Sequence, residues 1–241
     1  MERIALVTGG NRGIGFETAR GLAGLGHRVL IGSRELARGE AVAEELRAQG
    51  MTVEAIGLDV DDVVSHANVA ATIEERFGRL DVLVNNAAAI HDRDVRPSEV
   101  TVDVMRRTFE TNFIMLVALT QRLLPLLRRS DAGRIVNLTS TRASLKINAD
   151  PRLPMGEPQT LAYSASKAAV NLFTAMLALE LRDTPIKVNS ADPGWVKTEM
   201  GGEGATMEVA DGARTSIRLA TLPAEGPRDY AAAIPDAMWR R

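Results

Sequence analysis

Short runs of apolar, mostly β-branched residues alternate with longer stretches of helical periodicity, and this alternation limits the folds open to the chain more than any other feature. The runs that we interpret as strands cover residues 3–7, 27–32, 52–58, 80–85, 133–138 and 186–191. The stretches that we interpret as helices cover residues 13–25, 35–49, 61–77, 103–129, 161–182 and 209–222. Strands that alternate with helices form parallel sheets with helices on both faces. The pattern therefore predicts an α/β fold that binds its ligand at the carboxyl ends of the strands.

Composition excludes several classes of function. The chain has 241 residues, a net charge of −2 and no cysteine, which predicts a single domain (1–241), no nucleic-acid partner, no disulfide and no cysteine nucleophile. The three histidines, His27, His66 and His91, lack the spacing of metal ligands. We find no signal peptide, and no apolar stretch reaches the roughly 18 residues of a membrane span. We expect a cytoplasmic protein with no metal and no membrane partner.

The turn after the first predicted strand reads TGGNRGIG over residues 8–15. Gly9 permits a tight turn, and Gly13 and Gly15 permit close approach of the backbone to a pyrophosphate. The helix that follows supplies free N–H groups and the positive end of its dipole. We interpret this turn as a dinucleotide-binding loop, with an ordinary strand-to-helix turn as the alternative. Its candidate contacts are Gly9, Asn11, Arg12, Gly13, Ile14 and Gly15.

The end of the second predicted strand indicates which dinucleotide binds. An acidic residue there would bind the adenosine ribose and repel a 2′-phosphate, but this chain has Ser33 and Arg34. Arg34 can pair with a phosphate, Ser33 can donate to it, and Arg12 lies in the glycine turn on the same side. The cofactor is therefore predicted to be NADP(H). In the alternative, Arg34 is only a solvated residue at the start of a helix and NAD(H) is accepted as well.

A second motif, Tyr163-Ser-Ala-Ser-Lys167, lies on a predicted helix. Residues i and i+4 share a helix face, so both polar groups can reach one site. A free tyrosine has a pKa of about 10, and a neighbouring ammonium lowers it by stabilising the phenolate. The pair is therefore suited to general acid–base chemistry, although a Tyr and a Lys at this spacing also occur by chance.

Together with Asn85-Asn-Ala-Ala88 after the fourth predicted strand and Pro193-Gly194 after the sixth, these motifs resemble the short-chain dehydrogenase/reductase family. The resemblance covers residues 4 to about 200 and is strongest to the carbonyl-reductase-like branch. It implies a Rossmann-type doubly wound parallel sheet of about seven strands in a single domain. It also implies an oxidoreductase that interconverts a carbonyl and an alcohol by hydride transfer.

The resemblance assigns further site residues. It implies that Ser140 binds the substrate oxygen beside Tyr163, that Asn112 holds a water leading to Lys167, and that Lys167 also binds the nicotinamide ribose. Thr139 and Thr141 are neighbours that could be confused with Ser140. The remaining implied cofactor contacts are Asp59 and Val60 at the adenine, Asn86 and Ala87 after the fourth strand, and Pro193, Gly194, Val196 and Thr198 at the nicotinamide.

The chain also departs from the family pattern. Ala88 replaces a glycine of the family, and the Pro-containing segment 141–160 is longer than the usual connection. We expect this segment to be a loop that walls the substrate pocket and residues 200–207 to form a mobile lid. A homo-oligomer, dimer or tetramer, is favoured over a monomer. The identity of the small carbonyl or alcohol substrate and the roles of Tyr230 and Trp239 in the tail stay open. A dinucleotide-binding sensor or regulator without turnover is the alternative function.

Overall fold

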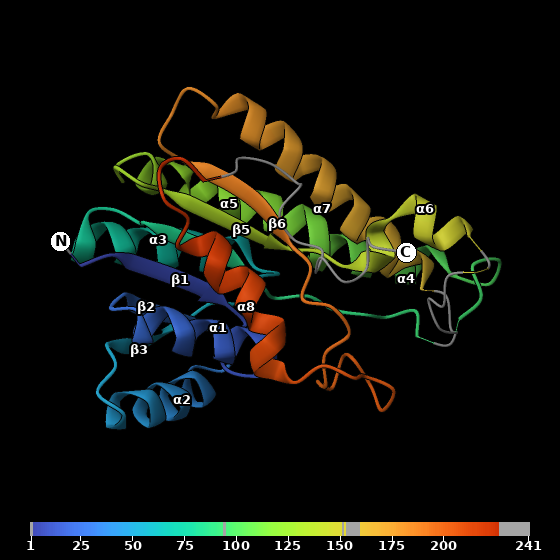
Figure 1. Cartoon of the computed structure of the whole chain (residues 1–241), viewed down its shortest axis with the longest axis horizontal. Helices are drawn as coiled ribbons and strands as arrows, with labels where there is room; N and C mark the ends of the chain where they lie inside the picture. Colours follow the sequence, from blue (N-terminus) through green and yellow to red (C-terminus); the bar gives the residue numbers. More distant parts are fainter. Residues whose placement is uncertain (1, 94, 151, 153–159, 227–241) are drawn as a thin grey trace.

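Six parallel strands form one sheet in the order β3-β2-β1-β4-β5-β6 in the computed structural model, which describes residues 2–93, 95–150, 152 and 160–226 (Figure 1). The strands are β1 (Ile4–Thr8), β2 (Arg28–Ser33), β3 (Val53–Gly57), β4 (Val82–Asn85), β5 (Arg134–Leu138) and β6 (Lys187–Ala191). The chain begins in the middle of the sheet, runs outward to β3 and then returns to the other side of β1. The crevice at the carboxyl ends of β1 and β4 is therefore the topological switch point, where such sheets bind ligands.

The prediction of an α/β doubly wound fold is confirmed, but the expected count of about seven strands is wrong for the described residues. After β6 the described chain forms an isolated bridge between Val196 and Met207, helix α8 (Val209–Ala220) and a turn at residues 223–226. The sequence there has no further alternating apolar run that could extend the sheet. Residues 227–241, with Tyr230 and Trp239, lie outside the described part.

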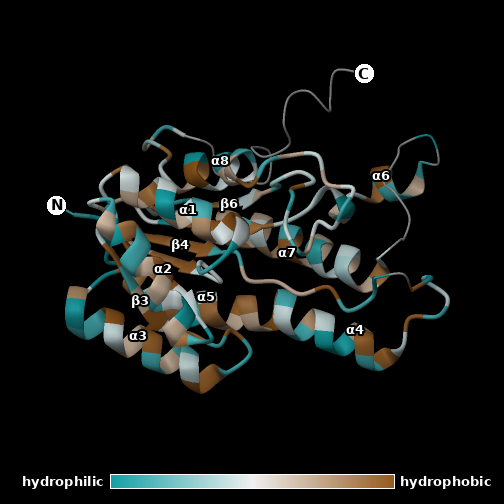
Figure 2. Cartoon of the chain, turned by 90° about the horizontal axis from the view of Figure 1, so that it is seen from below, coloured by the Kyte–Doolittle hydropathy of each residue, from teal (hydrophilic) through white to brown (hydrophobic). Residues whose placement is uncertain are grey.

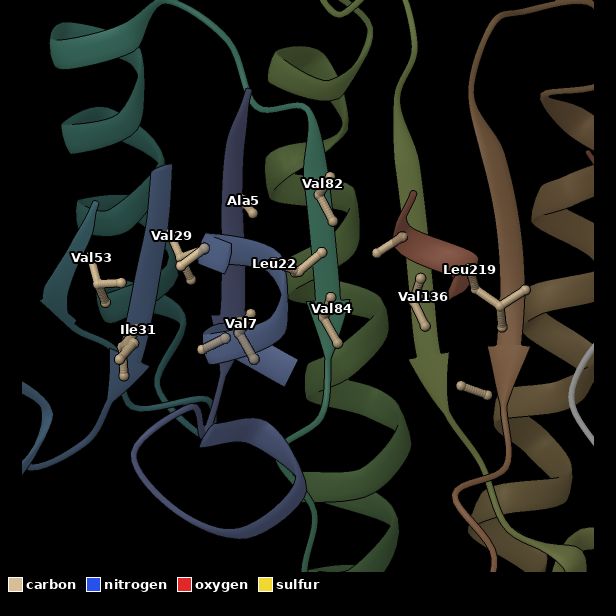
Figure 3. Packing of buried hydrophobic residues seen from close by; sticks show 14 of the residues in the cluster. Ala5, Val7, Leu22, Val29, Ile31, Val53, Val82, Val84, Val136 and Leu219 are labelled. Carbon is tan, nitrogen blue, oxygen red and sulfur yellow. The ribbon is translucent and has the colours of Figure 1, made fainter. Parts of the chain in front are cut away.

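Helices cover both faces of the sheet. The described α-helices are α1 (Gly13–Gly24), α2 (Leu36–Ala48), α3 (Val63–Phe77), α4 (Val102–Phe109), α5 (Met115–Leu127), α6 (Leu145–Ala149), α7 (Leu161–Glu180) and α8. Helices α1, α2 and α8 pack on one face, where Leu22 and Leu219 meet Val7, Val84 and Val136 (Figure 3). Helices α3, α5 and α7 cover the other face. Figure 2 shows the hydrophobic strand β4 between α1 and α8 above it and α3 and α5 below it.

The segment 103–129, which the periodicity predicts as one long helix, is interrupted. Helices α4 and α5 are separated by a π-helical turn, Glu110–Ile114, that contains Asn112. The wider turn lets the buried Asn112 side chain bond backbone outside the helix, to Ala89. Such π-turns are frequent at functional sites, which gives Asn112 more weight than the sequence alone does.

The segment 141–160 is less irregular than predicted. It begins with a 3₁₀ turn, Thr141–Ala143, and the short helix α6. Residues 151 and 153–159, which belong to the expected pocket wall, lie outside the described part. In the part of the chain that the structure describes, no helix has the length and apolar character to span a membrane.

Candidate active site

Four segments bring the predicted residues to one edge of the sheet. The glycine turn follows β1, Asn86 follows β4, Ser140 follows β5 and Pro193 follows β6. Because the four strands are parallel neighbours in the order β1-β4-β5-β6, their carboxyl ends lie side by side. The residues singled out in separate parts of the sequence therefore lie along one edge of the sheet, which includes the switch point.

The glycine turn has the geometry of a phosphate-binding loop. Gly9 and Gly13 adopt φ values of +61° and +54°, which favour glycine over any residue with a side chain. A Cβ atom on Gly15 would lie 2.4 Å from the Gly9 carbonyl oxygen. The N-cap residue of α1, Arg12, makes no side-chain cap hydrogen bond. The first N–H groups of α1 thus remain available to an anion such as pyrophosphate.

Thr8 and Asn86 lock this turn to the neighbouring strand. The Thr8 hydroxyl oxygen accepts hydrogen bonds from the backbone N–H groups of Asn86 and Ala87, both at 2.9 Å. The Asn86 amide nitrogen donates to the carbonyls of Thr8 at 2.8 Å and Gly9 at 3.3 Å. Asn86 thus orients the loop. Thr8 is not among the residues predicted from sequence, because its hydrogen-bond partners lie about 80 residues further along the chain.

At the end of β2, Arg34 is exposed, whereas Ser33 is buried and its hydroxyl donates to the Glu35 carbonyl at 2.8 Å. Arg34 is thus more accessible to an external phosphate than Ser33. Arg12 is also exposed, and its guanidinium pairs with Glu199.

The two candidate adenine contacts after β3 are held by local hydrogen bonds. The Asp59 carboxylate accepts from the Asp61 N–H at 3.1 Å. The Val60 carbonyl bonds the buried ring of His66 at 2.8 Å. Both residues are therefore placed at the carboxyl end of the strand next to β2, the side of the sheet that carries Arg34.

Tyr163 and Lys167 are both buried at the start of α7. The Lys167 ammonium donates to the Leu138 carbonyl at 2.8 Å and lies 5.8 Å from the centre of the Tyr163 ring. Leu138 is the last residue of β5, two positions before Ser140, so this bond ties the reactive helix to the strand that carries Ser140.

Burial dominates the electrostatics of this pair. It raises the pKa of Tyr163 to about 12; a hydrogen bond with Ser140 and the charge of Arg142 oppose the rise, and the charge of Asp192 adds to it. Burial also lowers the pKa of Lys167 to about 8. The sequence predicts that Lys167 lowers the pKa of Tyr163. In the structure burial raises this pKa instead, which leaves Tyr163 protonated at neutral pH.

Asn112 reaches toward the same helix. Its amide nitrogen donates to the Ala89 carbonyl at 2.9 Å and to the Ser166 hydroxyl at 3.1 Å, and its amide oxygen accepts from the Ala89 N–H at 2.8 Å. Ser166 precedes Lys167, so Asn112 is placed beside the lysine although it bonds its neighbour. The predicted water between Asn112 and Lys167 stays a prediction.

Asp192 is a residue that the sequence analysis did not select. It is buried between β6 and the Pro193-Gly194 turn, accepting from the Thr141 hydroxyl at 2.5 Å and from the Gly194 N–H at 2.9 Å. Burial raises the pKa of its carboxyl. An acidic residue directly after a buried strand and before Pro-Gly is the signal that could have identified it.

The predicted lid is folded back on itself next to the glycine turn. Val196 bridges Met207, and the Trp195 indole donates to the Gly201 carbonyl at 2.8 Å. A Cβ atom on Gly13 would lie 3.4 Å from the Thr198 methyl group. Thr198 therefore lies beside the glycine turn, and Pro193, Gly194 and Val196 precede it in the segment after β6. Among the described residues, no group of three or more histidine, aspartate or glutamate side chains could hold a metal ion.

Comparison with known proteins gives one consistent family. Residues 3–208 match the model of the family described as short chain dehydrogenase. The chain is 34% identical to the short-chain dehydrogenase anuI of Penicillium roqueforti (strain FM164), over 90% of this chain and 88% of that one. It is 32% identical to carbonyl reductase [NADPH] 1 of Homo sapiens, over 93% of both chains.

A similar solved structure is that of salutaridine reductase from Papaver somniferum. It superposes with a TM-score of 0.82 at 28% identity, over 95% of this chain and all of that one. Fold, site geometry and sequence therefore agree, and the chain belongs to the short-chain dehydrogenase family of oxidoreductases.

Proposed function

We propose that this protein is an NADP(H)-dependent carbonyl reductase, which interconverts a ketone or aldehyde and an alcohol with Tyr163 as the general acid and base. The observation that carries the proposal is the grouping of Tyr163, Ser140 and Lys167 at the sheet edge from which the glycine turn also leaves. The relatives named as NADPH carbonyl reductases support it.

The glycine turn and its surroundings fit the cofactor. The positive φ of Gly9 and Gly13, the absence of room for a Cβ on Gly15 and the uncapped start of α1 suit a pyrophosphate. Exposed Arg34 and Arg12 suit a 2′-phosphate. We assign the adenine to Asp59 and Val60, and the nicotinamide to Lys167 and the residues after β6. When bound, the cofactor supplies or accepts the hydride.

Tyr163 moves the proton in this scheme. Its raised pKa keeps the hydroxyl protonated near neutrality, so it can donate to a carbonyl oxygen that gains negative charge. Ser140 donates a hydrogen bond to the same oxygen and stabilises that charge. The Lys167 ammonium then stabilises the phenolate that remains, and Asn112 holds the water through which the proton is replaced.

The test is a titration of the purified protein with NADPH and with NADH, followed by a panel of aldehydes, ketones and quinones. Loss of reduced-nicotinamide absorbance reports turnover. We expect turnover with NADPH that disappears in Tyr163→Phe and falls strongly in Ser140→Ala, while both variants still bind NADPH. Tight NADPH binding without turnover across the panel would support the sensor function instead.

A further inference from the structure

The segment between β4 and α4 contacts each part of the candidate site in turn. Asn86 bonds the glycine turn, Ala89 bonds Asn112 in the π-helical turn, and Arg93 donates to the Met200 carbonyl at 2.7 Å. Between them, Asp92 accepts from the backbone N–H of Ala162 at 2.6 Å. The short segment 86–93 thus connects the glycine turn, the lid and the helix that carries Tyr163.

The bond from Asp92 supplies what α7 lacks at its own beginning. The N-cap residue of α7, Thr160, makes no side-chain cap hydrogen bond, and the first N–H groups of a helix need acceptors. The Asp92 carboxylate provides one from outside the helix, next to Tyr163, and a negative charge there is favoured by the helix dipole.

Fold stability alone gives a poor account of this carboxylate. Asp92 has no exposed surface, and its second oxygen, Oδ1, has no hydrogen-bond partner among the described residues. A buried carboxylate with an unmatched oxygen is costly, so a helix could be capped more cheaply by an exposed residue. Asp62, which caps α3 by accepting from the Val64 N–H at 2.9 Å, is such a cap.

We propose that Asp92 is a positioning residue. It fixes the first turn of α7 and thereby the position of Tyr163 relative to Ser140 and the glycine turn. The proposal rests on the proposed carbonyl reductase function. A shift of the reacting group by about 1 Å can cost a hundredfold in rate. Loss of a hydrogen bond one residue from Tyr163 can therefore lower kcat by a measurable factor.

The experiment compares variants with and without an acceptor at position 92. Asp92→Ala and Asp92→Val remove the acceptor, the second keeping the buried space filled, and Asp92→Asn retains it. Asp62→Ala is the matched control, since it removes a helix cap from α3. The measurements are Tm, the Kd of NADPH, kcat at saturating NADPH and hydrogen exchange of the backbone amides at the start of α7.

We expect the two variants without the acceptor to lose about ten- to a hundredfold in kcat, to bind NADPH within about twofold of wild type and to exchange the first amides of α7 faster. Asp92→Asn should restore kcat, and Asp62→Ala should lower only Tm. Because exchange does not depend on turnover, it tests the anchor even if the wild-type protein proves inactive.

The proposal is overturned if folded variants without the acceptor keep the wild-type kcat and exchange rate. It is also overturned if kcat and the affinity for NADPH fall by the same factor. Failure of Asp92→Asn to restore kcat would remove the hydrogen bond as the cause. If neither variant without the acceptor folds while Asp62→Ala does, Asp92 is a folding determinant and the positioning role is withdrawn.

Discussion

The Arg12 guanidinium pairs with the Glu199 carboxylate at 2.5 Å, joining the glycine turn to the residue that directly precedes the lid. The same guanidinium is a candidate contact for the 2′-phosphate of NADPH. An incoming phosphate and Glu199 therefore compete for one cation. Both side chains are largely exposed, so the ion pair contributes only about 0–1 kcal/mol.

Removal of Glu199 should strengthen NADPH binding. In Glu199→Gln, Arg12 is no longer paired, and we expect the Kd of NADPH to fall by up to about fivefold at low salt, the equivalent of about 1 kcal/mol. The Kd of NADH, which lacks the 2′-phosphate, should stay the same. Fluorescence titration measures both values, and Glu203→Gln, at an exposed acid in the neighbouring lid, is the control. An equal change for both dinucleotides would contradict the competition.

Arg34 should determine most of the preference for NADPH. Arg34→Asp replaces a phosphate partner with an acid that repels the phosphate and can bind the ribose hydroxyls. A hydrogen bond to a charged group is worth about 1.5–3 kcal/mol, so the Kd of NADPH should rise by about ten- to a hundredfold while that of NADH falls or stays the same. Arg38→Asp, on the exposed side of α2, is the control. If Arg34→Asp leaves the ratio of the two Kd values unchanged, Arg34 is only a helix-start residue.

Asp192 should raise the pH at which Tyr163 ionises. Its negative charge adds to the burial that raises the pKa of Tyr163, and Asp192→Asn removes the charge while keeping an acceptor for Thr141 and Gly194. The pKa of Tyr163 should therefore fall, and alcohol oxidation, which needs the phenolate, should gain rate at lower pH.

The chain has two tyrosines, so in a Tyr230→Phe background tyrosinate absorbance reports Tyr163 alone. We expect more tyrosinate at about pH 10.5 in Asp192→Asn than in the background protein, since that pH lies below the ionisation midpoint. Circular dichroism at the same pH checks the fold. An unchanged or smaller tyrosinate fraction would show that Asp192 acts on the Pro193-Gly194 turn and not on the phenol.

The features predictable from sequence are those whose cause is local. Alternation of apolar runs gave the positions of all six described strands, and the glycine turn needs only residues that adjoin each other. Tyr163 and Lys167 lie one helical turn apart, so their shared face follows from periodicity alone. The seventh strand was expected only from the resemblance, and no apolar run in the chain supported it.

The features that sequence reasoning missed depend on partners far apart in the chain. Asp92 meets Ala162 across 70 positions and Asp192 meets Thr141 across 51, and no periodicity connects such pairs. The pKa of Tyr163 was misjudged for a related reason. Its neighbour Lys167 is visible in the sequence, whereas the burial that raises the pKa of Tyr163 arises only when the sheet and its helices assemble.

Acid should destabilise the protein through His27. Burial and the charge of Arg3 lower its pKa and outweigh the opposing effects of the Leu22 backbone and the charge of Asp81, so the folded state disfavours the proton. The unfolded chain takes up that proton below a pH of about 6.5. The free energy of unfolding should therefore be constant above that pH and fall as the pH drops below it, down to the lowered pKa of the folded state.

Tm measured at pH 7.5 and 5 should differ less in His27→Gln than in wild type, whereas His91→Gln, at an exposed histidine, should retain the wild-type difference. If Tm falls by the same amount between pH 7.5 and 5 in His27→Gln and in wild type, the acid sensitivity arises from carboxylates elsewhere and not from His27.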